Sequence, residues 1–439
     1  MGQRSRILAE VFGFDGWKVK GAFFESADGK RVTVARATDT RGAKLVLVVE
    51  RRWMARCSQC ARACRVRHEQ LGARRWVDLP WAGHPVEIEY APSRIKCRAC
   101  GNAPIEMVAW ADPRQRQSRR LQHHLAVQAA SMPVMHVAAL HGLSWATVRR
   151  AEQRALERWD ASRPPRVLRH VGIDEKFLGR RNQLDEKFVT IVSDLETGEP
   201  IWIGYGRKVH VLKTWLNSLT PEEKARIQLF AMDMWPAYPA AIRETPGLEH
   251  AAIVHDPFHV MKRAVVALDE LRKEVFFRAG PELRRLGGGH GRRWLLLRAW
   301  ERNDKSQQAE LRRLFSYNST LARGYQLKEE FRDVLAAPTV TAMTKGLARI
   351  LRRTQSHRVK PLRRLHDCIR NHYDAIVALA EHRPATGRIE ALNNNWEVLV
   401  RRARGYRDHE YLLLKLRFMT AKPIRNERDV QRFVALAAA

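Results

Sequence analysis

The stretch Ile227-Gln-Leu-Phe-Ala-Met-Asp-Met-Trp-Pro-Ala-Tyr238 places one carboxylate, that of Asp233, directly after a short apolar run. Such a run predicts a buried strand, and the proline that follows Asp233 predicts the start of a helix. Four other β-rich runs surround this stretch, at residues 170–178, 186–194, 200–206 and 251–255. Three strands at hairpin spacing, followed by alternating helices and strands, predict an α/β fold with a ribonuclease-H-like core.

Two other acidic residues fit the same core. Asp174 lies at the centre of the first strand, where this type of sheet carries an acidic residue. Glu390 lies in Arg388-Ile-Glu-Ala-Leu-Asn-Asn394, where apolar residues recur at steps of three and four, so Glu390 borders the buried face of a helix. Asn394 shares that face and is expected near the site.

Three converging carboxylates repel one another and drive a proton onto one of them, whereas divalent cations make the cluster favourable. Two such ions, about 3.5 to 4 Å apart, activate a water and stabilise the leaving oxygen of a phosphodiester. The sequence therefore predicts a catalytic site in which Asp174, Asp233 and Glu390 hold two Mg2+ (or Mn2+) ions. Glu381 and Glu397 are alternatives to Glu390.

The composition favours a polyanionic partner. The 439 residues include 79 Lys and Arg against 47 Asp and Glu, a formal net charge of +32 with a pI near 10.7. Such an excess favours phosphate contacts and counterion release. No apolar run is long enough to cross a membrane, and the first residues lack the apolar stretch of a secretory signal. We therefore expect a cytoplasmic, nucleoid-associated protein with no membrane contact.

Four of the six cysteines form two Cys-x-x-Cys pairs, Cys57 with Cys60 and Cys97 with Cys100. Two such pairs predict one tetrahedral zinc ion (Zn2+), and four thiolates leave no open coordination position, so this zinc is expected to be structural. Strand-like residues 74–79 and 86–90 fill the span between the pairs, as in a zinc ribbon. Cys64 is a rival ligand, and Cys368 is expected to pack in a helix.

Residues 119–158 read as helical apart from two short breaks. Ala138, Gly142 and Val148 have the spacing of the small residue, the turn glycine and the packing residue of a helix-turn-helix, although a plain helical hairpin gives the same spacing. Ser144 is expected to cap the second helix, whose first turn would face the DNA major groove. The expected DNA-binding residues of this helix are Ser144, Trp145, Thr147, Arg149 and Arg150.

The domain organisation follows from these patterns. The paired prolines of Arg163-Pro-Pro-Arg166 predict an extended linker. A long helical block, rich in arginine, follows the last predicted strand. The expected domains are an N-terminal β-rich segment at 1–50, a zinc ribbon at 51–112, a helix-turn-helix domain at 113–162 and a catalytic domain at 168–439.

An ordered set of motifs resembles the ISL-three family of bacterial insertion-sequence transposases. Besides the cysteine pairs, it consists of Gly172-Ile-Asp-Glu175, Met232-Asp-Met-Trp-Pro-Ala-Tyr238, Asp256-Pro-Phe-His259, Arg388-Ile-Glu-Ala-Leu-Asn-Asn394 and Arg401-Arg-Ala-Arg-Gly-Tyr-Arg407. The resemblance covers nearly the whole chain. It implies a DDE transposase with the triad Asp174, Asp233 and Glu390, and an all-helical insertion in the core at about 262–385. It also implies that Asp256 and His259 lie beside the active site.

The activity that the resemblance implies is divalent-metal-dependent cleavage at the element's terminal inverted repeats, followed by strand transfer to target DNA. Arg401, Arg402 and Arg404 would clamp phosphates near the site. Because two ends must be cut in concert, we expect a homodimer or larger synaptic complex on double-stranded DNA. Two alternatives stay open, namely a transposase-derived DNA-binding regulator with an inert catalytic fold and a stand-alone ribonuclease-H-like nuclease.

Overall fold

The computed structural model describes residues 12–34, 36–37, 39–65, 67–178, 187–278, 292–355, 359–403, 406 and 408–438. The chain divides into two compact units. The first unit comprises Met1–Pro164, Val400–Gly405 and Lys422–Ala439, and the second comprises Pro165–Leu399 and Tyr406–Ala421. The end of the chain therefore belongs to the same unit as its beginning.

The first unit contains a five-stranded sheet in the order β2-β1-β3-β8-β7. Its strands are β1 (Trp17–Glu25), β2 (Arg31–Thr33), β3 (Lys44–Arg51), β7 (Arg74–Trp81) and β8 (His84–Tyr90). The strands expected at 74–79 and 86–90 are present, but β8 also pairs in parallel with β3. The sheet thus continues across residue 50, where the sequence had placed a domain boundary. Trp17, Trp76 and Trp110 pack in its core.

Four short strands surround the cysteine pairs in the same unit. They form two small antiparallel sheets, β4 (Ala55–Arg56) with β5 (Ala63–Cys64), and β6 (Arg67–Gln70) with β9 (Ser93–Ile95). Their pairing brings the first cysteine pair close to the second.

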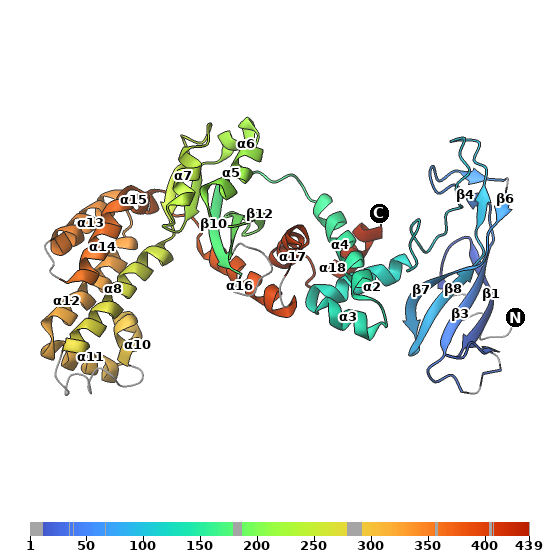
Figure 1. Cartoon of the computed structure of the whole chain (residues 1–439), viewed down its shortest axis with the longest axis horizontal. Coiled ribbons are helices and arrows are strands. Elements are labelled where there is room, and N and C mark those ends of the chain that lie inside the picture. The colour runs from blue at the N-terminus through green and yellow to red at the C-terminus, as the bar shows by residue number, and fades with distance from the viewer. Residues whose placement is uncertain are drawn as a thin grey trace. The chain divides into compact units, whose positions relative to one another are not determined.

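The helices of the first unit are α2 (Arg119–Ser131), α3 (Val134–Leu140), α4 (Trp145–Ala161) and α18 (Glu427–Ala438), all labelled in Figure 1. The two predicted breaks are confirmed, because Pro133 precedes α3 and Gly142 adopts a φ of +59° in the turn before α4. The sequence did not predict the packing of α18 against α2 and α4, in which Phe433 is buried.

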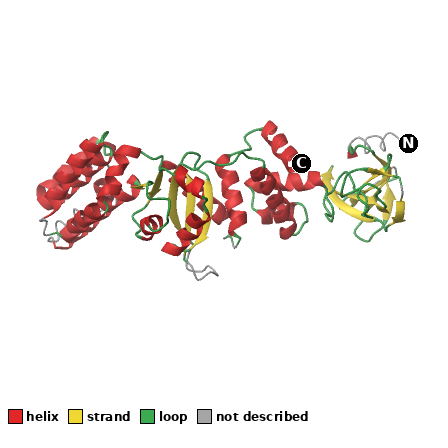
Figure 2. Cartoon of the chain, turned by 90° about the horizontal axis from the view of Figure 1, so that it is seen from above, coloured by secondary structure: helices red, strands yellow, loops and turns green. Residues whose placement is uncertain are grey.

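The second unit contains a sheet in the order β12-β11-β10-β13-β14. Its strands are β10 (His170–Phe177), β11 (Phe188–Asp194), β12 (Pro200–Tyr205), β13 (Leu229–Met232) and β14 (Ala252–His255), so all five predicted strands are confirmed. The first three are antiparallel, whereas β10, β13 and β14 are parallel. Figure 2 shows this sheet in yellow among red helices. The connecting helices are α5 (Val209–Ser218), α6 (Pro221–Arg226) and α7 (Ala237–Arg243).

A block of helices follows β14, as expected. It consists of α8 (Pro257–Arg278), α10 (Arg292–Leu297), the 3-10 helix η1 (Trp300–Arg302), α11 (Lys305–Tyr317), α12 (Ser319–Leu335), α13 (Val340–Gln355), α14 (Lys360–Asn371) and α15 (Tyr373–His382). Its apolar core includes Met234, two residues after β13, and Val254 of β14, so the block packs against the sheet. Cys368 lies on α14 with its sulfur 3.7 Å from that of Met234.

Two helices then return to the sheet, α16 (Gly387–Ala403) and α17 (His409–Ala421). The guanidinium of Arg417 on α17 donates to the carbonyl oxygens of Pro200 and Ile201 on β12, at 3.0 and 2.8 Å. The expected mixed α/β fold is thus confirmed. Among the described residues, no helix combines the length and the hydropathy that crossing a membrane requires.

Candidate active site and DNA-binding elements

Three aspartates lie in a row across the second sheet, Asp174 within β10 and Asp233 and Asp256 directly after β13 and β14. Ile173 of β10 is paired with Met232 of the parallel strand β13, so the next residues, Asp174 and Asp233, lie at the same level on neighbouring strands. Met232 is in turn paired with His255 of β14, which puts Asp256 next in the row. Because parallel strands end at a common edge, the topology brings together carboxylates that are far apart in the sequence.

Hydrogen bonds fix the first two carboxylates. Asp174 is buried and accepts from the backbone N–H of Glu175 at 2.8 Å and from the side-chain amide of Asn393 at 2.6 Å. Asp233 accepts from the backbone N–H of Trp235 at 2.9 Å. Burial raises the pKa of Asp233, and the charge of Asp174 raises it further, against the opposing effects of the Trp235 N–H and of His259. Two negative charges are thus unfavourable here, and a bound cation would stabilise them.

The predicted pair of Asp256 and His259 is formed. Asp256 accepts from Nδ1 of His259 at 2.9 Å and from the backbone N–H of Phe258 at 3.1 Å. This hydrogen bond raises the pKa of His259, and the charges of Asp174 and Asp233 contribute to the same shift. The imidazolium form is therefore favoured beside the row of carboxylates.

Helix α16 approaches this edge because Gly172 has no side chain. A Cβ atom at Gly172 would lie 2.7 Å from Oγ of Ser193 and 3.1 Å from Cγ1 of Ile389. Ile389 packs with buried residues of the sheet, including Leu229 and Ala231. The first turns of α16 therefore lie directly on β10 and β13.

The helix presents an amide to Asp174, and this amide belongs to Asn393, one residue before the Asn394 that the sequence suggested. Asn394 is exposed. Glu390 is also exposed and lies one turn before Asn393, while Glu397 lies one turn after it. Glu381 lies instead on α15, with its carboxylate 4.0 Å from His382. The contact thus connects α16, rather than α15, to the site.

The three carboxylates do not form one tight cluster. Within the described part of the chain, the ligand atoms of Asp174, Asp233 and Glu390 do not all lie within 4.8 Å of one another. The arrangement that the fold supplies is a pair of adjacent aspartates with a helix bearing Glu390 docked beside them.

Two residues of this region had no predicted role. Nη1 of Arg207 donates to Oε1 of Glu175 at 3.3 Å, and its guanidinium lies 3.8 Å from the ring centroid of Phe188 and 4.0 Å from that of Trp235. Burial raises the pKa of Glu175, and Asp233 and Asp174 raise it further. Glu175 belongs to the motif Gly172-Ile-Asp-Glu175, but nothing in the sequence around Arg207 indicates the partners of this arginine.

The four predicted zinc ligands lie together in the first unit. The thiol sulfurs of Cys57, Cys60, Cys97 and Cys100 are all within 4.8 Å of one another. The distance from Cys57 to Cys100 is 3.8 Å and that from Cys60 to Cys97 is 3.6 Å. A tetrahedron with Zn–S bonds of about 2.3 Å has edges of about 3.8 Å, so the cluster can hold a zinc ion.

The two cysteine turns repeat the same backbone pattern. Cys57 N–H donates to the carbonyl of Arg62, and Cys97 N–H donates to that of Asn102, each at 2.9 Å. The backbone N–H of Cys100 lowers the pKa of Cys97 to about 6, which favours its thiolate, whereas burial and the neighbouring thiols raise the pKa of Cys60 and of Cys100. The rival Cys64 lies outside the group of four, and its thiol donates to the carbonyl of Arg62 at 3.5 Å.

The helix-turn-helix consists of α3, the turn at Gly142 and α4. Ala138 and Val148 are both buried in the small core of these helices, as their spacing predicted. Oγ of Ser144 accepts from the backbone N–H of Thr147 at 3.2 Å, which confirms the predicted cap. Trp145 is half exposed, and the guanidinium of Arg149 lies 5.6 Å from its ring centroid. Arg150 is exposed on the same helix.

The three arginines expected near the catalytic site follow the end of α16. Arg401 and Arg402 occupy its exposed last turn, in the part of the helix that belongs to the first unit. Arg404 lies outside the described residues.

Comparison with known families gives two matches. A family model described as a transposase, from the ISL3 group, matches residues 171–416, more than half of the chain. A model of the helix-turn-helix domain of transposase family ISL3 matches residues 106–156.

Curated relatives agree with these matches. The chain is 28% identical over 365 residues to the transposase for insertion sequence element IS1001 of Bordetella parapertussis, covering 82% of this chain and 87% of that protein. It is 26% identical over 388 residues to the transposase for insertion sequence element IS1557 of Mycobacterium tuberculosis, covering 82% and 84%.

Proposed function

Because the chain belongs to the ISL3 family of insertion-sequence transposases, we propose that it binds the terminal inverted repeats of its element, cleaves there and joins the released 3′ ends to target DNA. The observation that carries this proposal is the row of Asp174 and Asp233 on neighbouring parallel strands, with Asn393 of α16 bonded to Asp174. Both aspartates and α16 fall within the region that resembles transposases.

The proposed core is ribonuclease-H-like. The sheet order β12-β11-β10-β13-β14 supports this assignment, since three antiparallel strands are extended by two strands parallel to β10. The helical block from α8 to α15 separates the second aspartate from α16, as expected for an insertion between the second and third acids. We propose domain boundaries near residues 113 and 168, with the insertion at about 262–385.

Asp174, Asp233 and Glu390 are the proposed ligands of two divalent cations, Mg2+ or Mn2+. When bound, such ions stabilise the charge on the attacking and leaving oxygens of a phosphodiester. The site has the chemistry to accept cations, because burial and the charge of Asp174 raise the pKa of Asp233 despite the opposing effects of the Trp235 N–H and His259, and a cation would relieve the remaining repulsion.

The neighbouring side chains position these carboxylates. The amide of Asn393 orients Asp174, and the backbone N–H of Trp235 orients Asp233. The His259 imidazolium, held by Asp256, would balance negative charge and position a DNA phosphate. Glu390 and Glu397 flank Asn393 on α16, and the family resemblance favours Glu390 as the third acid.

The first unit is the proposed DNA-recognition module. Zinc held by the four thiols would stabilise the ribbon, and Ser144, Trp145, Thr147, Arg149 and Arg150 would face the major groove. Arg401 and Arg402 would contact phosphates, and Arg404 is proposed with them from the sequence alone. Since two ends are cut together, we propose a homodimer or larger synaptic complex on DNA.

Two other functions use parts of the same chain. A DNA-binding regulator would need only the first unit, and a stand-alone nuclease would need only the second. The paired aspartates of an intact site favour catalysis over the regulator, and the helix-turn-helix favours sequence-specific ends over a nuclease.

The test is cleavage of a labelled duplex that carries the gene's own flanks, with Mg2+ or Mn2+. We expect nicks at defined end positions with the wild type and none with Asp233→Asn or Glu390→Gln, while binding persists. Glu397→Gln serves as the matched control and should cut normally. Specific binding without cutting under either metal would favour the regulator, and cutting without regard to the ends would favour the nuclease.

A further inference from the structure

The arginines of the first unit fall into two groups. Several are paired with carboxylates inside the fold, such as Arg75 with Glu25 and Arg119 with Asp112. Arg114 and Arg116, in contrast, are exposed, and their side chains make no ion pair or hydrogen bond within the part of the chain that the structure describes. Paired arginines stabilise the unit, whereas these two present their charge to solvent.

The loop that carries Arg114 and Arg116, residues 112–118, is held firmly at its backbone. The N–H of Val77 on β7 donates to the carbonyl of Arg116, and the N–H of Ser118 donates to the carbonyl of Val77, each at 2.8 Å. From the other side, Nη1 of Arg154 on α4 donates to the side chain of Gln115 at 2.7 Å. The loop is thus fixed between β7 and α4, and it lies within residues 106–156, which match the helix-turn-helix domain of the ISL3 transposases.

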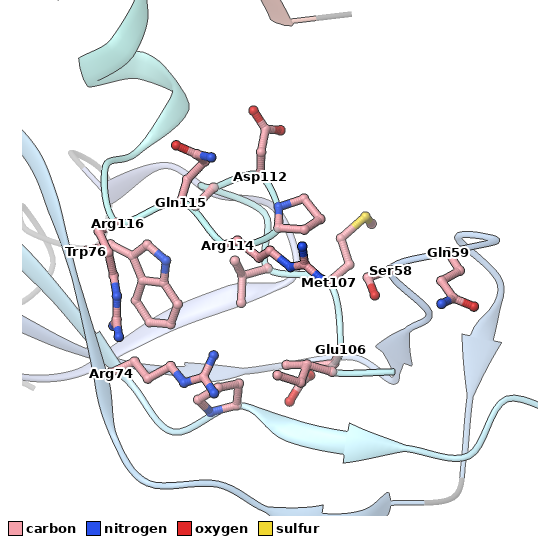
Figure 3. A pocket seen from close by; sticks show the side chains of 15 residues that line it. Ser58, Gln59, Arg74, Trp76, Glu106, Met107, Asp112, Arg114, Gln115 and Arg116 are labelled. Carbon is pink, nitrogen blue, oxygen red and sulfur yellow. The ribbon is translucent and has the colours of Figure 1, made fainter. Parts of the chain in front are cut away.

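Two adjoining hollows share this loop. The larger, of about 660 Å³, brings Arg74, Arg114 and Arg116 together beside Trp76 (Figure 3). Its carboxylates are already neutralised, because Glu106 pairs with Arg51 at 3.1 Å and Asp112 pairs with Arg119.

The smaller hollow, of about 210 Å³, connects the loop to α4. Arg114 and Arg116 line it together with Thr147, Arg150 and Arg154. A continuous positively charged surface therefore runs from the start of α4, across the loop, to the start of β7 at Arg74.

We propose that the loop at residues 112–118 is a second DNA contact, in which Arg114 and Arg116 bind backbone phosphates next to the segment read by α4. This inference rests on the proposed binding of DNA by the helix-turn-helix. The planar guanidinium loses less freedom for each hydrogen bond that it forms with a phosphate than a lysine would, and its binding releases counterions from the duplex. Contacts to phosphates carry no sequence information, so the loop would add affinity and set orientation but not selectivity.

The test compares two labelled duplexes of equal length, one with the terminal repeat and one unrelated, bound to the full-length zinc-loaded protein between 50 and 200 mM salt. For the double variant R114A/R116A we expect affinity to fall roughly 10- to 100-fold for both duplexes alike, because each substitution removes charged hydrogen bonds to phosphate. The slope of log K against log salt should fall by about 2, one phosphate for each arginine. R36A/R41A removes the same charge from a turn outside both hollows and should change neither quantity.

A second variant separates binding from folding. Arg114 adopts a φ of +64°, a conformation that glycine adopts without strain. R114G should therefore melt at the same or a higher temperature than the wild type while binding both duplexes more weakly.

The outcomes are distinct. If the wild type binds neither duplex, the proposed function and this inference fall together. If the wild type binds but R114A/R116A binds with unchanged affinity and salt slope, only the loop contact is overturned. It is equally overturned if the loss is confined to the terminal-repeat duplex at an unchanged slope, since the loop would then read bases.

Discussion

The four thiols of the first unit lie near enough to share one ion, whereas the three carboxylates of the second unit do not. The sulfur pairs are 3.6 and 3.8 Å apart. Among the described residues, Asp174, Asp233 and Glu390 are not gathered within 4.8 Å. Each thiol pair comes from one short turn with its own backbone hydrogen bonds. The carboxylates come from two strands and a helix that is distant in the sequence.

This difference teaches how each site depends on the rest of the fold. Local turns preform the thiol cluster, so its ion should contribute to folding. The carboxylates repel one another and depend on the docking of α16 on Gly172, so the carboxylate site should cost some stability, and its ions should serve catalysis rather than folding. Substitutions in the thiol cluster should therefore unfold the first unit, whereas substitutions at the carboxylates should abolish cleavage.

The largest expected effect is that of Cys97→Ser. Because structural zinc binding of roughly 10 kcal/mol is linked to folding, losing one thiolate should remove most of the zinc and unfold the cysteine turns. Zinc content and thermal melting measure this directly. Cys64→Ser is the matched control, since its sulfur lies outside the group of four, and it should keep both the metal and the melting temperature. A Cys97→Ser protein that still held zinc and melted normally would show that the thiol cluster does not contribute to folding in this way.

The next largest effect is that of Asp174→Asn on cleavage. Losing a proposed metal ligand should slow cleavage on the order of 1,000-fold, equivalent to about 4 kcal/mol in the barrier. Stability should stay the same or rise, because a buried charge next to Asp233 is removed. Single-turnover cleavage measures the expected loss of rate, and a melting curve on the same sample measures the expected stability.

The control for that change is Asp194→Asn, at another buried aspartate of the same sheet. Asp194 accepts hydrogen bonds from Glu196 N–H and from Thr197 in the turn after β11. Its substitution should lower stability but leave the folded protein able to cut. If both variants lost stability and activity in parallel, the second site would be as structural as the zinc site.

The sequence predicted the elements of both sites better than their assembly. Periodic apolar residues and turn signals are local, so the strands of the second sheet and the Ser144 cap were predictable. Pairing between distant strands is not local, and the joining of β8 to β3 was therefore missed. The same holds for α18, whose apolar face finds its partners on α2 and α4.

The candidate site shows the same limit at the level of single residues. The carboxylates were identified from their positions at the centre of one strand, after the end of another and on a helix face. Asn393 and Asn394 are equally compatible with the helix face of Glu390, because steps of three and four residues both return to it. Only the docking of α16 selects Asn393 as the contact to Asp174. Arg207 likewise could not be predicted, since its ring contacts come from Phe188 and Trp235.

A moderate effect is expected for Gly172→Ala. The added methyl would meet Ser193 and Ile389 at 2.7 and 3.1 Å, so overpacking should cost about 1–3 kcal/mol and move α16 away from β10. Cleavage should fall further than the melting temperature alone explains, since Asn393 and Glu390 move with the helix. Gly21→Ala is the control, because its methyl would meet nothing within 4 Å. Unchanged cleavage by Gly172→Ala would show that the site does not depend on docking.

The smallest effect concerns pH. The hydrogen bond to Asp256 raises the pKa of His259 above its usual value near 6.5, so folding takes up a proton there. This contribution is fully present below about pH 6.5 and is lost as the pH rises through the higher pKa of the folded state. It should amount to no more than about 1 kcal/mol, because the histidine is partly exposed.

His255 gives the opposite trend, since burial lowers its pKa to about 4 and the folded state therefore loses stability as the pH falls below about 6.5. The contribution of His259 is isolated by the difference between wild type and Asp256→Asn, in which the pKa of His259 should fall back while His255 is unaffected. Melting curves at pH 6 and pH 8.5 should show the wild type losing more stability with rising pH than the variant. Parallel curves would mean that Asp256 does not raise the pKa of His259, and the proposed phosphate contact at His259 would lose its electrostatic basis.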